Sequence, residues 1–88
     1  MVTPSRITVV ADDRERPGRL FAELAVRPEV RLRTERLPAG DYRVDASFLV
    51  ERKTLTDLAA SIVSGRLFAQ ALRLARVDGL RPVLLLEG

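Results

Sequence analysis

The sequence FLVERK, residues 48–53, begins with three apolar residues and ends with three charged ones. This pattern predicts a strand that leaves the core at its carboxyl end. Because side chains alternate between the two faces of a strand, Glu51 and Lys53 lie on the same face, one pleat apart. Lys53 is also the only lysine among the 15 Lys and Arg residues. A lysine is a compact charge whose pKa moves readily, so it suits a side chain that holds or polarises a water molecule.

A turn and a second short strand precede this segment. Residues 38–41, Pro-Ala-Gly-Asp, form a strong turn signal. Residues 42–44 and 48–52 predict a hairpin that is closed by the polar residues 45–47. Asp41, at the start of the first of these strands, then lies across from Glu51 and Lys53. Two carboxylates in this position can bind one hard cation, which lowers the pKa of a water molecule and neutralises charge on a phosphate. The arrangement suits a metal-dependent phosphodiesterase.

Each of these residues also has a simpler interpretation. Asp41 follows a glycine and is a common turn residue, while Glu51 and Lys53 can form a charge pair at a sheet edge. Asp57 stands three residues after Thr54, a spacing typical of a helix cap. The acidic residues within 12–15 can be a solvated loop. The residues taken singly leave these alternatives open.

The rest of the chain predicts an α/β domain with the element order β-α-β-β-β-α-α-β. Residues 7–11 predict a buried strand that ends at Asp12, and residues 30–37 alternate as in a half-exposed strand. Residues 82–86 are a continuous apolar run, which predicts a central strand covered on both faces. Helical spacing of apolar residues predicts helices over 20–27, 54–63 and 67–75. The predicted architecture is a mixed central β-sheet flanked by helices.

Composition narrows the chemistry. The chain has 88 residues, at most one small domain, and contains neither cysteine nor histidine. Any metal is then held by oxygen ligands, which favours Mg²⁺ or Mn²⁺ over zinc. A formal net charge of +3 and a pI near 10.5 tilt the surface toward polyanions. We find no apolar run of membrane-spanning length and no signal-peptide pattern, so a reducing, cytoplasmic setting is expected.

The predicted domain spans residues 7–88, and residues 1–6 are predicted to be a flexible N-terminus. The chain stops at Gly88, directly after its most apolar strand. We therefore expect the domain to be truncated at its C-terminus.

The ordered motifs together resemble the XPF family of structure-specific DNA endonucleases. The family signature is Gly-Asp, a variable gap, and Glu-Arg-Lys-x-x-x-Asp, matched here by residues 40–41 and 51–57. Residues 12–15 are similar to the family's Asp-x-Arg-Glu. Residues 64–70 resemble its Gly-Arg-Leu-x-x-Gln helix, and residues 81–87 resemble the strand that follows. The resemblance covers nearly the whole chain from Ile7 onward.

This resemblance implies a restriction-endonuclease-like core and a set of functional residues. The implied ligands of Mg²⁺ or Mn²⁺ are Asp12, Asp41 and Glu51, with the main-chain carbonyl of Arg52 as a further ligand. The implied catalytic residues are Asp41, Glu51, Arg52, Lys53 and Asp57. Among these, Lys53 positions the attacking water, and an ion pair between Arg52 and Asp57 orients the strand–helix junction. Supporting or DNA-contacting roles are implied for Arg14, Glu15, Arg66 and Gln70.

The implied function is that of a Mg²⁺- or Mn²⁺-dependent endonuclease domain. It hydrolyses a phosphodiester near single-strand/double-strand junctions, in flap or fork DNA, in DNA repair. The expected partners are branched or flap DNA and a second subunit, in a homodimer or heterodimer, with no membrane and no small-molecule cofactor. The expected setting is intracellular, either cytoplasmic and nucleoid-associated or nuclear. Family members usually continue into dimerisation structure and a tandem helix-hairpin-helix module, so junction specificity does not reside wholly in these residues.

Two other functions compete with this one. The first is a non-catalytic DNA-binding or partner-binding module of the same fold, whose affinity for DNA falls steeply with salt. The second is a small α/β interaction domain that does not bind nucleic acid. Carboxylates repel phosphates, so the full acidic set favours the nuclease over a pure DNA binder.

Overall fold

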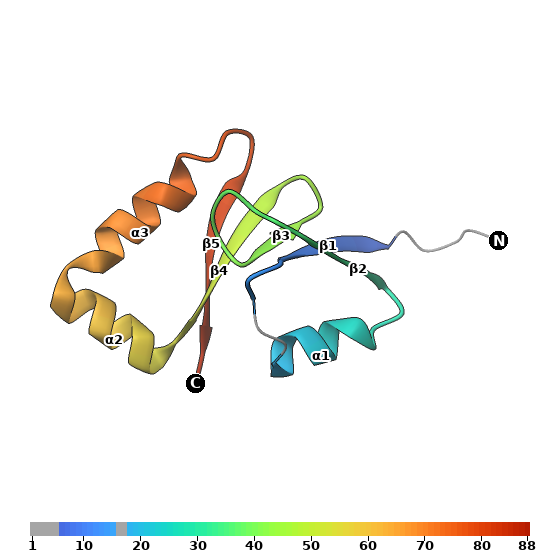
Figure 1. Ribbon diagram of the computed structural model, residues 1–88, viewed down its shortest axis with the longest axis horizontal. Coiled ribbons are helices and arrows are strands. Elements are labelled where there is room, and N and C mark those ends of the chain that lie inside the picture. The colour runs from blue at the N-terminus through green and yellow to red at the C-terminus, as the bar shows by residue number, and fades with distance from the viewer. Residues whose placement is uncertain (1–5, 16–17) are drawn as a thin grey trace.

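A five-stranded mixed sheet runs through the centre of the structure, a computed structural model that describes residues 6–15 and 18–88 (Figure 1). The predicted flexible N-terminus therefore lies outside the described residues, apart from Arg6. The elements of the described ranges are β1 (Ile7–Asp12), α1 (Arg19–Ala25), β2 (Val30–Glu35), β3 (Tyr42–Val44), β4 (Phe48–Thr54), α2 (Leu55–Ser64), α3 (Arg66–Ala75) and β5 (Arg81–Glu87). This is the predicted order of elements.

The strands lie in the order β2-β1-β3-β4-β5. The β1–β3 and β3–β4 pairs are antiparallel, while β1–β2 and β4–β5 are parallel. The predicted hairpin is present, since Tyr42 faces Val50 and Val44 faces Phe48. Parallel neighbours need a crossover, and the chain supplies α1 between β1 and β2 and the α2–α3 pair between β4 and β5 (Figure 1).

The sheet separates two apolar clusters, because successive residues of a strand point to opposite faces. One cluster packs against α3 and consists of Val10, Leu37, Ala39, Leu49 and Leu74. The other packs against α1 and consists of Val9, Ala11, Tyr42 and Val50, with Leu20, Phe21 and Leu24 at its margin. Leu49 has no exposed surface. Burial of such a side chain contributes about 2 kcal/mol to stability, so β4 is anchored directly beside its charged end.

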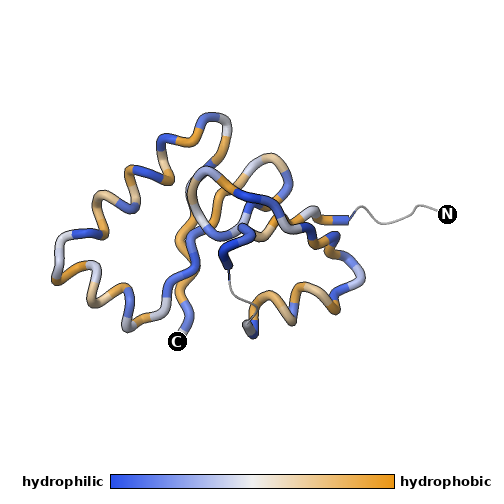
Figure 2. Tube along the Cα trace, viewed as in Figure 1, coloured by the Kyte–Doolittle hydropathy of each residue, from blue (hydrophilic) through white to orange (hydrophobic). Residues whose placement is uncertain are grey.

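The position of β5 differs from the prediction. Residues 82–86 were expected to form a central strand, but among the described strands β5 lies at the sheet edge and pairs with β4 alone. Its apolar side chains are 38–47% exposed from Val83 to Leu86. In Figure 2 the C-terminal strand is coloured as hydrophobic before its hydrophilic end. An apolar run indicates that a strand has apolar surroundings, and it does not say whether those surroundings lie within these 88 residues.

The junction between β4 and α2 follows the predicted chemistry. Thr54 is the N-cap of α2, and its Oγ1 accepts a hydrogen bond from the Asp57 amide at 3.0 Å. The helix ends at Gly65, as the Ser-Gly pair predicts. The charged end of β4 is therefore followed without a loop by a capped helix, which fixes the direction of the chain after Lys53.

None of the helices in the described ranges is both long and apolar enough to cross a membrane.

Candidate active site

Three acidic residues from three adjacent strands lie in a row at one end of the sheet. The β1–β3 register continues to place Asp12 opposite Asp41, and the Asp12 amide donates to the Asp41 carbonyl at 2.8 Å. The β3–β4 register places Asp41 opposite Glu51, and the Asp41 amide donates to the Val50 carbonyl at 2.8 Å. Strand alternation then directs all three side chains to the face that carries α3. We call Asp12, Asp41 and Glu51 the acidic row.

Asp41 and Glu51 are two neighbouring carboxylates, and both are partly buried. Burial raises the pKa of Glu51, the Asp41 carboxylate raises it further, and Lys53 and Arg73 act in the opposite direction. Lys53 is only 8% exposed and lies on the same face, one pleat beyond Glu51. One Asp41 oxygen accepts the Arg52 amide at 2.8 Å. The other Asp41 oxygen and both oxygens of Glu51 accept no hydrogen bond from the described residues, so they are available to a ligand.

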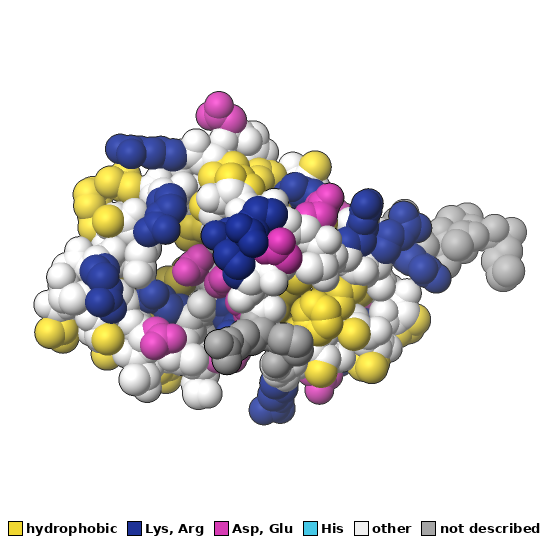
Figure 3. Space-filling model, viewed as in Figure 1, with side chains coloured by type: hydrophobic (Ala, Val, Ile, Leu, Met, Phe, Trp, Pro, Cys, Tyr) yellow, Lys and Arg dark blue, Asp and Glu magenta, His cyan; other side chains and the backbone are white. Residues whose placement is uncertain are grey.

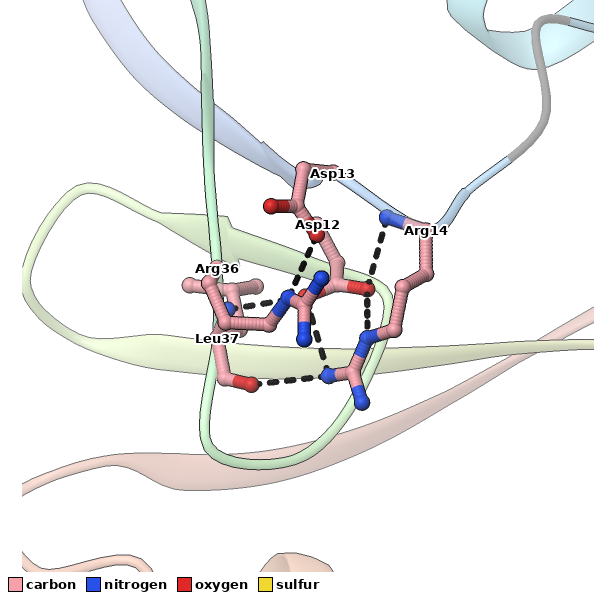
Figure 4. A network of polar contacts seen from close by, with 5 residues as sticks. All are labelled: Asp12, Asp13, Arg14, Arg36 and Leu37. Carbon is pink, nitrogen blue, oxygen red and sulfur yellow. Dashed lines mark hydrogen bonds and ion pairs between the residues drawn. The ribbon is translucent and has the colours of Figure 1, made fainter.

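Asp12 has a different environment, which Figure 4 shows. Its Oδ2 accepts the Arg14 amide at 3.1 Å and Arg14 Nε at 2.8 Å, while its Oδ1 accepts the other Arg14 nitrogen at 3.1 Å and the Leu37 amide at 2.8 Å. Hydrogen bonds from Arg14 are the main cause that lowers the pKa of Asp12 to about 2. The ionised carboxylate is thus already neutralised by a neighbour. Arg14 also donates to the Leu37 carbonyl at 2.9 Å.

Arg52 joins three parts of the chain on the opposite face of β4. Its Nε donates to Glu15 at 2.8 Å, and another guanidinium nitrogen donates to Glu87 at 3.2 Å. The predicted ion pair between Arg52 and Asp57 is wrong, because Arg52 points to the α1 side while Asp57 lies in the first turn of α2. Burial raises the pKa of Glu15 despite the Arg52 contact.

Tyr42 lies next to this ion-pair network. It is 3% exposed, and its hydroxyl has no hydrogen-bond partner among the described residues. Burial, together with nearby Glu15, raises its pKa to about 12. The phenol therefore stays neutral beside the carboxylates near neutral pH.

A polar cavity of about 110 Å³ opens beside Glu51, between the Gly40 turn and α3. Its lining includes Gly40, Glu51, Gln70 and Arg73. The structure thus brings the predicted Gln70 to the site, whereas Arg66 is exposed at the start of α3 and does not line this cavity. Arg73 was not singled out from the sequence. Its spacing of three from Gln70, which places both on one side of a helix, is the signal that could have found it.

Glu87 was also missed. It ends the apolar run of β5, and only the parallel β4–β5 register, in which it pairs with Thr54, brings it close to Arg52. The sequence alone holds no signal for this contact.

The acidic row has the donor chemistry of a magnesium or manganese site, because carboxylate oxygens are the ligands these ions prefer. The described residues nevertheless contain no group of three acidic side chains arranged to hold a metal ion. The Asp12 carboxylate is bonded to Arg14. Within the acidic row, Asp41 and Glu51 offer uncommitted oxygens, and a cation would relieve the repulsion between them. Acidic side chains lie among basic ones near the middle of the face in Figure 3. The acidic side chains attract a cation, and the basic ones attract a phosphate.

The chain is similar to known proteins over most of its length. The ERCC4 domain matches residues 11–88. The DNA repair endonuclease XPF of Cricetulus griseus is 39% identical over 80 residues, 91% of this chain and 8% of that protein. The 3'-flap repair endonuclease Xpf of Saccharolobus solfataricus is 35% identical over 82 residues, 93% of this chain and 34% of that protein. The chain therefore spans a minor part of each relative.

A solved structure of XPF from Aeropyrum pernix in complex with DNA superposes with a TM-score of 0.81 at 40% identity. The match covers 94% of this chain and 40% of that one. At this identity the likeness concerns both sequence and fold. The predicted restriction-endonuclease-like α/β fold is confirmed.

Proposed function

The chain belongs to the ERCC4 domain family of XPF-type nucleases, and from this membership we propose that it is a metal-dependent DNA endonuclease domain. The proposed substrate is DNA with a single-strand/double-strand junction, such as a flap or a fork. Relatives that are named DNA repair endonuclease and 3'-flap repair endonuclease support this substrate class.

The observation that carries the proposal is the pairing of Asp41 with Glu51, with Lys53 buried one pleat further along. The two carboxylates bring negative charge and uncommitted oxygens, and the lysine supplies a positive charge on the same face. We assign Asp41 and Glu51 to metal binding and Lys53 to holding the attacking water beside the phosphate. A charge of this kind, fixed before the substrate arrives, stabilises charge that develops in the transition state.

Asp41 and Glu51 fit a Mg²⁺ or Mn²⁺ ion better than Asp12 does. When bound, such an ion activates water and neutralises charge on a non-bridging phosphate oxygen. Asp12 is the third proposed ligand, and both of its oxygens would need to be free of the Arg14 guanidinium to hold the ion. The contacts of Arg52 with Glu15 and Glu87 hold β4 from the opposite face of the sheet. They also direct the Arg52 guanidinium away from the proposed metal ligands Asp41 and Glu51.

The remaining proposals follow from the relatives. We propose branched DNA as the partner and an intracellular setting in which DNA is present, as the names of the repair enzymes indicate. Asp57, in the first turn of α2, and Arg66, the first residue of α3, are proposed as supporting residues. A homodimer or heterodimer stays a prediction.

The test uses end-labelled flap, fork and plain duplex DNA, incubated with the protein in Mn²⁺ and in EDTA. Asp41→Asn and Lys53→Ala should each lower the cutting rate by about 100-fold or more, the scale seen when one charge-stabilising group is removed. Asp78→Asn, which makes the same chemical change at an exposed position after α3, is the matched control and should cut at the wild-type rate. Circular dichroism checks that each variant is folded.

The outcomes separate the competing functions. Metal-dependent cutting near the junction that Asp41→Asn loses supports the nuclease. Equal cutting by wild type and Asp41→Asn sinks the assignment of Asp41 as a metal ligand. If branched DNA shifts on a gel but is never cut, the non-catalytic binding module is favoured, and the engagement of Asp12 by Arg14 is the observation that supports it.

A further inference from the structure

The polar cavity beside Glu51 contains one positive side chain. Arg73 lines it together with Glu51 and Gln70, and neither Arg73 nor Gln70 forms an ion pair or side-chain hydrogen bond with any other part of the described chain. The volume of about 110 Å³ is several times the roughly 30 Å³ share of a water molecule. The cavity is therefore large enough for a charged group larger than water.

The close packing of α3 fixes where Arg73 lies. Leu74, 6% exposed, packs into the cluster with Leu49 and lies against the Gly40 turn. Arg73 is the preceding residue and Gln70 lies about one turn earlier, so this buried neighbour fixes the part of α3 that lines the cavity. The Gln70 Oε1 atom is enclosed and receives no donor from the described residues. Arg73 stands three residues along the same helix, so the two residues lie on one side of α3.

Glu51 alone would repel an anion from this cavity. The guanidinium changes the balance, because a planar fork of donors binds a phosphate through two parallel hydrogen bonds. Resting on the nuclease function proposed above, we propose that Arg73 contacts a phosphate of the DNA backbone as the strand passes Glu51, with Gln70 orienting its guanidinium. Arg73 would then hold the DNA from the α3 side, while Lys53 acts from the strand side.

The test is a double-mutant cycle in DNA binding, so it does not depend on cutting. Fork DNA with a single neutral methylphosphonate at successive positions is bound in EDTA to the 88-residue chain and to Arg73→Gln, and affinity is measured by fluorescence anisotropy. Arg76→Gln is the matched control, because Arg76 lies three residues further along, at the C-cap of α3, and does not line the cavity. Arg73 is exposed, so the substitution leaves the packing of Leu74 unchanged.

We expect one methylphosphonate position to weaken binding of the wild type and of Arg76→Gln, yet to have no effect on Arg73→Gln. The slope of log affinity against log salt should also be less steep by about one for Arg73→Gln. Additive effects of Arg73→Gln and every methylphosphonate would overturn the inference, even if the wild type cuts DNA. Conversely, this coupling together with no cutting in Mn²⁺ would remove the nuclease function and keep the phosphate contact.

A free phosphate ion offers Arg73 the same ligand group as a phosphate of the DNA backbone. Inorganic phosphate at matched ionic strength is therefore added to wild type and Arg73→Gln, and thermal unfolding is followed. Equal melting temperatures with and without phosphate support a contact that needs the DNA chain. Protection of the wild type alone, without any methylphosphonate coupling, assigns the cavity to free phosphate and overturns the DNA contact.

Discussion

Replacing Gly40 with alanine should destabilise the protein far more than the addition of one methyl group suggests. Gly40 has φ +76°, in the left-handed region that alanine adopts with difficulty. A Cβ atom there would lie 3.0 Å from Leu49 Cγ and 3.2 Å from Leu74 Cδ2. Both leucines are buried, so neither can move aside freely.

The magnitude follows from two contributions. The left-handed backbone costs alanine about 1 kcal/mol. Forcing an extra carbon into a packed core costs about 1–3 kcal/mol. We therefore expect Gly40→Ala to lower the free energy of unfolding by about 2–4 kcal/mol, which is a large fraction of the roughly 5–15 kcal/mol that holds a domain folded.

Gly79→Ala is the matched control, because Gly79 has φ +78° and a Cβ atom there meets nothing within 4 Å. It carries the backbone contribution alone. Urea unfolding of both variants, followed by circular dichroism, then gives the packing contribution by difference. In thermal unfolding, each kcal/mol corresponds to about 4–8 °C for a domain of this size.

Equal losses of stability in Gly40→Ala and Gly79→Ala would refute the reasoning. That result would mean that α3 does not pack closely on the Gly40 turn. Without that packing, the placement of Gln70 and Arg73 beside Glu51 would lose its support as well.

Two further predictions concern pH. The pKa of Asp12 is lowered from 3.8 to about 2 in the folded protein, so its charge stabilises the fold above about pH 4, and this stabilisation, on the order of 2 kcal/mol, is lost as the pH falls toward 2. Asp12→Asn should therefore flatten the decline of unfolding free energy across that range, and an unchanged decline would contradict the Arg14 contact. The pKa of Glu51 is raised above its ordinary 4.5, so ionised Glu51 destabilises the fold. Glu51→Gln should be more stable than wild type to urea at pH 7, and this gain should vanish below about pH 4; a loss of stability at pH 7 would contradict the burial of the carboxylate.

Local patterns in the sequence predicted the elements and one pairing of the site. The alternation in residues 48–53 and the turn at Gly40 were enough to place Asp41 opposite Glu51, because a hairpin fixes its own register. Thr54 and Gly65 bounded α2 for equally local reasons. These features depend on residues that are close in sequence.

Contacts between distant elements were not predictable in the same way. Arg52 was expected to pair with Asp57, five residues away, but the strand directs it to Glu15 and Glu87 on the other side of the sheet. The apolar run of β5 correctly predicted a strand, but the prediction that this strand is central was wrong. Sequence patterns indicate the secondary structure and the burial that a residue favours. Strand order and side-chain partners are set by the packing of the whole sheet.

The acidic row is built from strands that meet only in the assembled tertiary structure. The β3–β4 hairpin can bring Asp41 and Glu51 together by itself, but Asp12 arrives on β1, separated from them along the chain by α1 and β2. A chain that has formed only its local structure therefore holds an incomplete charge arrangement. The full site exists only when β1 is paired with β3, so a fragment that lacks β1 cannot hold the complete acidic row.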